Sequence, residues 1–132
     1  MSYSGAGVLP YTTDSHGKVS YLFSQEAHGR DKGTYADFGG KRDHGETSKT
    51  TALREMKEES RGVVSPYTSN VHFAGNNHGY HVYTAPVPQV NYQSQFAHTH
   101  MHGAAYNEKS KIVSVSAHQV QHAVGVYLTY TT

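Results

Sequence analysis

The chain has 132 residues, which is enough for one hydrophobic core and too few for two. Its 11 basic and 10 acidic residues give a formal net charge of +1, so the composition does not indicate a nucleic-acid-binding surface. The absence of cysteine excludes disulfides, thiolate metal sites and a cysteine nucleophile. We therefore expect one domain over residues 1–132.

The N-terminal segment lacks a basic stretch followed by a long apolar run, the pattern of an export signal. No window approaches the roughly 20 apolar residues that a membrane span requires. We expect a cytoplasmic protein that does not associate with membranes. The sequence leaves the oligomeric state open, and a homodimer is one arrangement that it allows.

The first strands are predicted from short runs of β-branched and aromatic residues at 5–12 and 18–23. The polar segment between these runs contains a glycine and is typical of a hairpin turn. A third, brief strand is predicted at 35–38, and we expect it to stop at Gly39 and Gly40, where a turn follows.

The most clearly predicted helix covers residues 48–60, which contain neither glycine nor proline. Its apolar residues recur at helical spacing, namely Ala52, Leu53 and Met56. Thr47 or Ser48 supplies an N-cap oxygen, and Gly62 lies where a helix stop belongs.

The remaining elements are predicted from shorter patterns. Strands are expected at 71–74, 80–85, 111–116 and 126–130, a short helix at 117–123, and a long irregular loop at 89–108. The predicted order is therefore mixed, with several strands, one strong helix and a weaker helix near the end.

Three glutamates of the strong helix lie on one face, because Glu55, Glu58 and Glu59 stand at i, i+3 and i+4. Like charges so close repel, and Arg54 can compensate only Glu58, at i+4. Hard divalent cations such as Mg²⁺ bind carboxylate oxygens. The pattern alone allows two interpretations, a metal-binding face or a solvent-exposed helix face rich in glutamate.

The spacing toward the N-terminus separates these interpretations. Gly40 is followed by five residues, Glu46, seven residues and then Arg-Glu-Met-Lys-Glu-Glu at 54–59. This resembles the Nudix box, in which Gly, five residues, Glu, seven residues, Arg-Glu, an aliphatic residue, any residue and Glu-Glu are followed by any residue, Gly and an aliphatic residue. Every position through Glu59 matches, with Met56 in the aliphatic position.

The end of the motif departs from the family pattern. Arg61 stands where the box has glycine, and Gly62 stands where it has an aliphatic residue. We interpret this difference as a helix that is longer by one residue.

The resemblance implies an α/β fold, the Nudix α/β/α sandwich with a mixed β-sheet. It also implies a metal-dependent hydrolase that cleaves the pyrophosphate linkage of a nucleoside diphosphate linked to another moiety, by water attack at phosphorus. The implied cofactor is Mg²⁺ or Mn²⁺. The implied partner is a nucleotide-type small molecule, with a capped RNA end as the one nucleic-acid substrate left open.

The resemblance also assigns roles to individual residues. The implied metal ligands are Glu55, Glu58, Glu59, the Gly40 carbonyl and, from a distant loop, Glu108. The implied catalytic residues are Glu55 and Glu58, one of which activates water, with Arg54 and Glu46 as a supporting pair. Candidate substrate-binding residues are Lys41 and Arg42, for phosphate, and Tyr80, for stacking on a base.

Several alternatives stay open at this point. Glu108, the only carboxylate after Gly62, could be an exposed turn residue, and Lys41 and Arg42 could simply be solvated. A catalytically silent nucleotide-binding module of the same fold is the main alternative function. His98, His100 and His102 alternate, which indicates either polar loop positions or a transition-metal site in a histidine-rich metal-storage protein.

Overall fold

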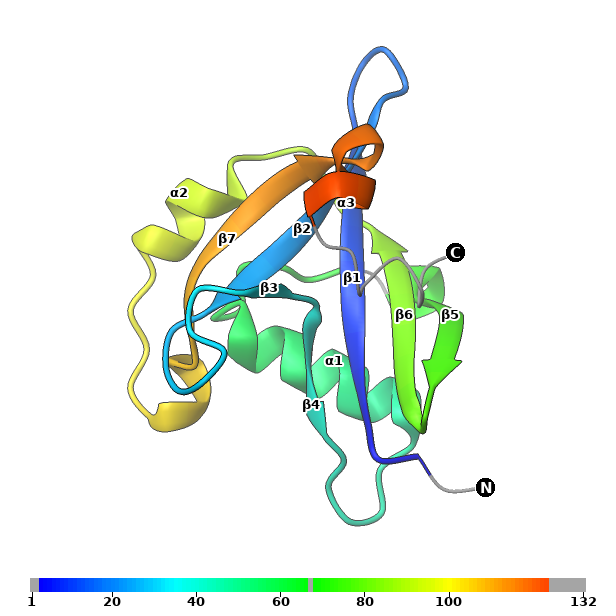
Figure 1. The fold of residues 1–132 in the computed structure, drawn as a ribbon, viewed down its shortest axis with the longest axis vertical. Helices are drawn as coiled ribbons and strands as arrows, with labels where there is room; N and C mark the ends of the chain where they lie inside the picture. Colours follow the sequence, from blue (N-terminus) through cyan, green and yellow to red (C-terminus); the bar gives the residue numbers. More distant parts are fainter. Residues whose placement is uncertain (1–2, 67, 124–132) are drawn as a thin grey trace.

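Seven strands and three α-helices make up the described part of the chain, residues 3–66 and 68–123 of the computed structural model (Figure 1). The strands are β1 (Gly5–Thr13), β2 (Val19–Glu26), β3 (Tyr35–Ala36), β4 (Phe38–Lys41), β5 (His72–Asn77), β6 (Tyr80–Pro86) and β7 (Lys109–Ser116). The helices are α1 (Ser48–Glu59), α2 (Tyr92–Ala97) and α3 (Ala117–Ala123), with short 3-10 helices at Thr68–Asn70 and Ala104–Tyr106.

Strand β1 is the centre of one mixed sheet, whose order is β3-β2-β1-β6-β5. It pairs in parallel with β6, whereas β4 and β2 pair with it in antiparallel fashion. Residues 5–8 are registered with β4 and residues 11–13 with β2. Pro10 lies between these two segments, and because proline has no N–H to donate, it is suited to this change of partner.

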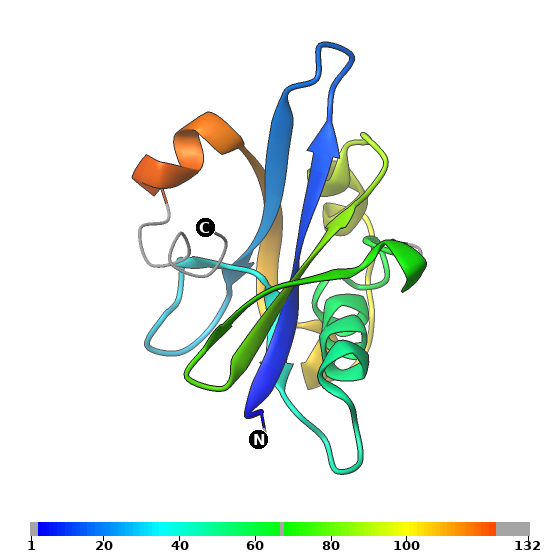
Figure 2. The same ribbon diagram turned by 90° about the vertical axis from the view of Figure 1, so that its right-hand side faces the viewer.

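Helices cover both faces of the sheet, as Figure 2 shows: α1 and α2 lie on one face and α3 on the other. The apolar core is divided in the same way. The cluster beneath α1 and α2 includes Ala6, Val8, Phe38, Met56 and Phe96, and the cluster on the opposite face consists of Leu9, Phe23, Val82 and Val120. The predicted α/β/α sandwich with a mixed sheet is confirmed.

Helix α1 begins where a side-chain oxygen caps it, since Thr47 Oγ1 accepts a hydrogen bond from the Thr50 N–H at 3.2 Å. Its packed face repeats at helical spacing and consists of Thr51, Ala52, Glu55, Met56 and Glu59. The helix ends at Glu59, one residue before the predicted end at residue 60, and Ser60 is its C-cap. No helix among the described residues is long and apolar enough to cross a membrane.

Two sequence predictions about loops need correction. The strand at 35–38 does not stop at Gly39 and Gly40, because β4 continues through both glycines and pairs with β1. The segment 89–108 is not a continuous irregular loop, since α2 and a 3-10 helix form within it. Asn91 starts α2 by accepting a hydrogen bond from the Ser94 N–H at 2.9 Å. The predicted strand at 126–130 lies outside the described residues.

The glycines of β4 lie where a larger side chain would clash with its neighbours. A Cβ at position 39 would lie 2.7 Å from the Gly7 Cα and 1.9 Å from the Tyr80 hydroxyl oxygen. We expect Gly39→Ala to lower the free energy of unfolding by about 1 to 3 kcal/mol, the usual cost of overpacking. Chemical denaturation measures this, with Lys41→Ala on the same strand as the exposed control. A loss below about 0.5 kcal/mol, typical of a surface substitution, would contradict the prediction.

Candidate active site

Two of the three glutamates on α1 are buried. Glu59 is 3% exposed and Glu55 is 9% exposed, although carboxylates are almost never buried without a partner. Glu58 is partly exposed and Lys57 is exposed. A helix face that only met solvent would expose all of these residues, so the solvent-exposed interpretation is wrong for Glu55 and Glu59.

The backbone of β4 lies directly against these carboxylates. The Gly39 N–H donates a hydrogen bond to Glu59 Oε1 at 2.8 Å. At position 40, a Cβ would lie 2.6 Å from the carboxyl carbon of Glu55. The predicted turn at Gly40 is therefore corrected: the residue is part of an extended strand, and glycine is needed there because the Glu55 carboxyl lies so close.

Arg54 joins the glutamates of the motif into one network. Its Nε donates to Glu46 Oε2 at 2.8 Å, and its Nη1 donates to Glu55 Oε1 at 3.0 Å and to Glu58 Oε1 at 3.4 Å. Its Nη2 donates to the Lys41 carbonyl at 3.0 Å. The predicted pairing of Arg54 with Glu46 and with Glu58 is confirmed, and the contact with Glu55 is an addition to it.

Glu46 anchors this network from the loop that precedes α1. Its Oε1 accepts hydrogen bonds from the Asp43 N–H at 2.9 Å and the Thr51 hydroxyl at 2.8 Å. These donors favour the ionised carboxylate. The hydrogen bond from Arg54, followed by that from Asp43, lowers the pKa of Glu46 to about 2.

Whereas hydrogen bonds lower the pKa of Glu46, burial raises the pKa of the two glutamates on the packed face. It raises the pKa of Glu59 to about 9, and the nearby Lys109 ammonium opposes this shift. Burial also raises the pKa of Glu55, and the charge of Arg54 opposes it. The ionised forms of Glu55 and Glu59 therefore depend on nearby positive charge.

Lys109 was not singled out by the sequence reasoning, although the structure places it in the cluster. Its side chain is 3% exposed, forms an ion pair with Glu26, and lies 3.8 Å from Glu59 Oε1. The only signal in the sequence is a lysine directly after Glu108 at the start of a strand. Such a lysine looks like a solvated residue until the strand register is known.

Glu108 lies directly before β7. Its backbone carbonyl accepts from the Ala27 N–H at 3.0 Å, which fixes its position beside the end of β2. Its side chain is exposed, yet its charge contributes to the raised pKa of Glu55. The structure thus brings Glu108 into electrostatic reach of the motif.

Arg61, where the motif departs from the family pattern, adopts the conformation that glycine would favour. Its φ is 56°, in the left-handed region. Its guanidinium donates to the carbonyls of Tyr106 at 3.0 Å and Thr99 at 3.2 Å, and lies 4.0 Å from the centre of the Phe96 ring. These contacts attach the end of α1 to the segment that carries Glu108.

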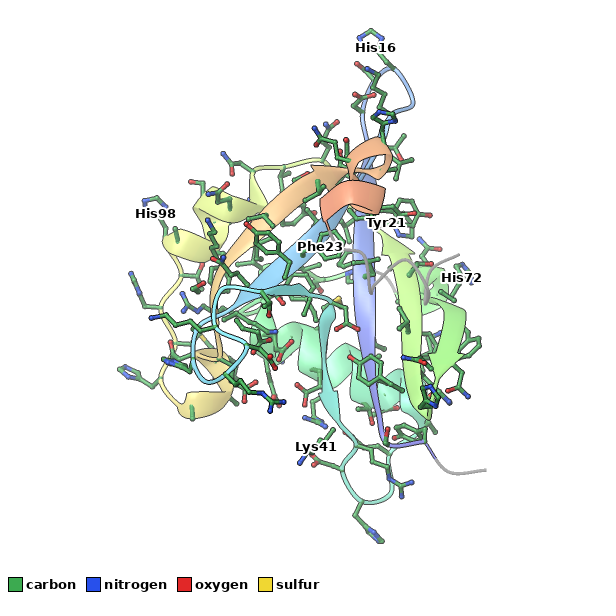
Figure 3. All side chains as sticks on the ribbon, in the orientation of Figure 1. His16, Tyr21, Phe23, Lys41, His72 and His98 are labelled. Atoms are coloured by element: carbon green, nitrogen blue, oxygen red, sulfur yellow. The ribbon has the colours of Figure 1, made fainter. Side chains whose placement is uncertain are left out.

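The candidate substrate residues separate into two groups. Lys41 and Tyr80 line a cavity of about 330 Å³ beside Gly40, with Ser4 and Gly5. Figure 3 shows Lys41 at the end of β4. The Tyr80 hydroxyl donates to Asp37 Oδ2 at 2.8 Å, which orients the ring.

Arg42 does not line this cavity. Its guanidinium lies over the ring of Tyr3, 5.2 Å from the ring centre. Of the two basic residues, only Lys41 therefore lines this cavity.

Tyr80 packs against the core cluster on the sheet face opposite α1. A Cβ at Gly39 would meet the Tyr80 hydroxyl, whereas a Cβ at Gly40 would meet the Glu55 carboxyl. Tyr80 and Glu55 therefore lie on opposite faces of β4.

The donor set of the site fits a hard divalent cation, because it consists of carboxylates and the strand carbonyls close to Gly40. Among residues 3–66 and 68–123, however, no group of three or more His, Asp or Glu side chains is arranged to hold a metal ion. Arg54 currently binds oxygens of both Glu55 and Glu58. Its Nη1 contacts Oε1 of each carboxylate, so a metal ion would share these two atoms with the guanidinium or displace it from them.

The three alternating histidines do not form a metal site in this arrangement. His98 follows α2, its Nδ1 lies 2.8 Å from the Ser94 carbonyl oxygen, and it points outward in Figure 3. His100 and His102 are exposed. The extended geometry that would align the three imidazoles is absent at His98, because this residue caps a helix.

Replacing Arg61 tests its role as a link between α1 and the segment 99–107. Arg61→Gly relieves the left-handed strain, about 1 to 2 kcal/mol, but removes charged hydrogen bonds and the contact with Phe96. We expect a net loss of about 1 to 3 kcal/mol in unfolding free energy. Faster amide hydrogen exchange across 99–107 should accompany it. A variant as stable as the wild type, with unchanged exchange, would contradict this role.

The lowered pKa of Glu46 predicts a pH-dependent contribution to stability. Because the pKa in the folded state is about 2 and the ordinary value is 4.5, the contribution is complete above pH 4.5 and is lost as the pH falls through 2. The difference in melting temperature between wild type and Glu46→Gln should therefore shrink between pH 4.5 and 2. A difference that stays constant or grows over this range would contradict the ion pair with Arg54.

A scan against models of protein families and a search of curated proteins gave no match to this chain. Solved structures, in contrast, match it over nearly its whole length. A Nudix hydrolase from M. smegmatis, RenU, shares 18% sequence identity at a TM-score of 0.58, over 90% of this chain and 74% of that one.

Two further matches are closer in shape. A C. elegans Ap4A hydrolase binary complex has 16% identity and a TM-score of 0.61, over 92% of this chain and 85% of that one. The NUDIX domain of Shewanella oneidensis NrtR, complexed with ADP ribose, has 19% identity and a TM-score of 0.63, over 93% and 78%. The chain therefore has the Nudix fold, as the resemblance of residues 40–59 predicts.

Proposed function

We propose that the chain is a metal-dependent hydrolase that cleaves the pyrophosphate linkage of a nucleoside diphosphate linked to another moiety. One observation carries the proposal: two glutamates of the motif, Glu55 and Glu59, are held on the packed face of α1, against the backbone of Gly39 and Gly40. Burial of these carboxylates costs free energy, and a purely structural helix could avoid that cost with apolar residues at the same positions.

The proposed site combines a cation-binding end and a substrate cavity. Glu55, Glu58 and Glu59, with the Gly40 carbonyl and Glu108, would hold Mg²⁺ or Mn²⁺, which supplies charge neutralisation at phosphate and activation of water. Lys41 and Tyr80 border the cavity of about 330 Å³, which reaches Gly40 from the face of β4 opposite Glu55. A phosphate in this cavity would have the Lys41 ammonium and the Tyr80 ring beside it, with the backbone of β4 between it and Glu55.

In the proposed reaction a water oxygen attacks phosphorus, and the bond between phosphorus and the bridging oxygen breaks. A carboxylate of Glu55 or Glu58 accepts the proton of the water, while Lys41 compensates negative charge on the phosphates. Arg54 and Glu46 keep these carboxylates in position through their mutual ion pair. The similar solved structures include an Ap4A hydrolase and a domain complexed with ADP ribose. Ap4A and ADP ribose therefore both belong in a substrate panel.

The second candidate is a nucleotide-binding module without catalysis. It is favoured by one specific observation, namely that Arg54 binds oxygens of both Glu55 and Glu58 in this structure. A module of this kind keeps these contacts while a nucleotide occupies the cavity beside Lys41 and Tyr80.

Substitution of Glu58 separates the two candidates. We expect the wild type to release phosphate-containing products from at least one member of the panel with Mg²⁺. Glu58→Gln should reduce the rate by about 100- to 10,000-fold, the usual contribution of a positioned acid or base. Lys57→Gln, an exposed neighbour on the same helix, is the matched control and should retain the wild-type rate.

Two outcomes would decide against hydrolysis by this site. Activity that is unchanged in Glu58→Gln would exclude the assigned role of this residue. Saturable nucleotide binding by the wild type, measured calorimetrically, without turnover of any panel member would instead favour the binding module.

A further inference from the structure

A cation already lies inside the glutamate cluster. The ammonium of Lys109 forms an ion pair with Glu26 and lies 3.8 Å from Glu59 Oε1. Lys109 and Glu59 are each only 3% exposed. The positive charge is therefore shielded from solvent and shared between two carboxylates, one from β2 and one from α1.

An irregularity in the sheet places Lys109 in this position. Between β2 and β7, Gln25 is registered with Lys111, but Glu26 is registered with Lys109, so Ser110 is an extra residue on β7. Such a bulge changes the direction of the neighbouring side chains. In consequence Lys109 is buried beside Glu26, whereas Ser110 is exposed.

Hydrogen bonds fix the groups around the ammonium. Glu59 is fixed by the Gly39 N–H at 2.8 Å. The carbonyl of Lys109 accepts from Arg61 Nη2 at 3.5 Å, and the neighbouring carbonyl of Glu108 accepts from Ala27. Because both Glu59 and the start of β7 are anchored, the ammonium has a defined place in the fold.

We propose that Lys109 is a built-in cation of this site, which takes the place of one divalent ion between Glu26 and Glu59. The proposal rests on the proposed function, in which the neighbouring glutamates bind Mg²⁺ or Mn²⁺. An ammonium offers three donors and one positive charge, so it neutralises buried carboxylates without opening a coordination sphere to water. The chain should therefore bind one divalent ion fewer than the same cluster without the lysine.

Counting bound Mn²⁺ tests this inference. Free Mn²⁺ is measured by electron paramagnetic resonance during titration of the full chain, so the readout does not depend on activity. We expect Lys109→Ala, which removes the ammonium and leaves space, to bind one more Mn²⁺ per chain than the wild type. Lys109→Arg keeps the charge and should bind the same number as the wild type.

Thermal unfolding supplies a second readout. Without metal, Lys109→Ala should melt below the wild type because Glu26 and Glu59 lose their shared cation. Saturating Mn²⁺ should raise its melting temperature by more than it raises that of the wild type. The double variant Lys109→Met with Glu59→Gln removes both charges and keeps side chains of similar volume. It should not bind the additional Mn²⁺ that Lys109→Ala binds.

The outcomes separate this inference from the proposed function. Equal Mn²⁺ counts for the wild type and Lys109→Ala would overturn it, as would absence of Mn²⁺ from both. Failure of Lys109→Ala to fold even in saturating Mn²⁺ would also overturn it, since the divalent ion is expected to replace the ammonium. One ion in Lys109→Ala and none in the wild type would support it while contradicting metal dependence of the natural chain.

Discussion

The burial of two carboxylates on the packed face of α1 is the constraint on which the rest of the site depends. Glu55 and Glu59 stand at helix positions that elsewhere in this chain are filled by residues such as Ala52 and Met56. Ionised carboxylates there need compensating charge within a few ångströms. Arg54 supplies it on the side of Glu55, and Lys109 supplies it on the side of Glu59.

The backbone around the cluster follows from the same constraint. Gly39 and Gly40 leave room for the Tyr80 hydroxyl and the Glu55 carboxyl, and the Gly39 N–H binds Glu59 directly. The same proximity of strand backbone and helix carboxylates underlies the proposed function. A divalent cation could bind there and meet phosphate oxygens only if part of the negative charge of the carboxylates stays uncompensated. The guanidinium of Arg54 therefore stabilises the fold and, in the proposed function, would compete with the cation for oxygens of Glu55 and Glu58.

The sequence predicts the parts of this structure that depend on local spacing. Residues 47–60 indicate the helix, its cap and the shared face of the glutamates, because helical periodicity and capping are local properties. Lys109 could not be predicted, since its burial depends on a bulge between strands that are more than 80 residues apart in sequence. The contacts of Arg61 could not be predicted for a similar reason. Its partners lie in a segment that contains α2, a helix of 6 residues, which is fewer than two turns and too short for a clear periodic pattern.

In the proposed function, the glutamates of α1 form a cation site beside Gly40. Anomalous diffraction from crystals of the chain grown with Mn²⁺ tests it most directly. We expect an anomalous peak bounded by carboxylate oxygens of Glu55 and Glu58, with Arg54 retaining Glu46 as its partner. No peak at this position, or a peak only at His98, His100 and His102, would contradict it.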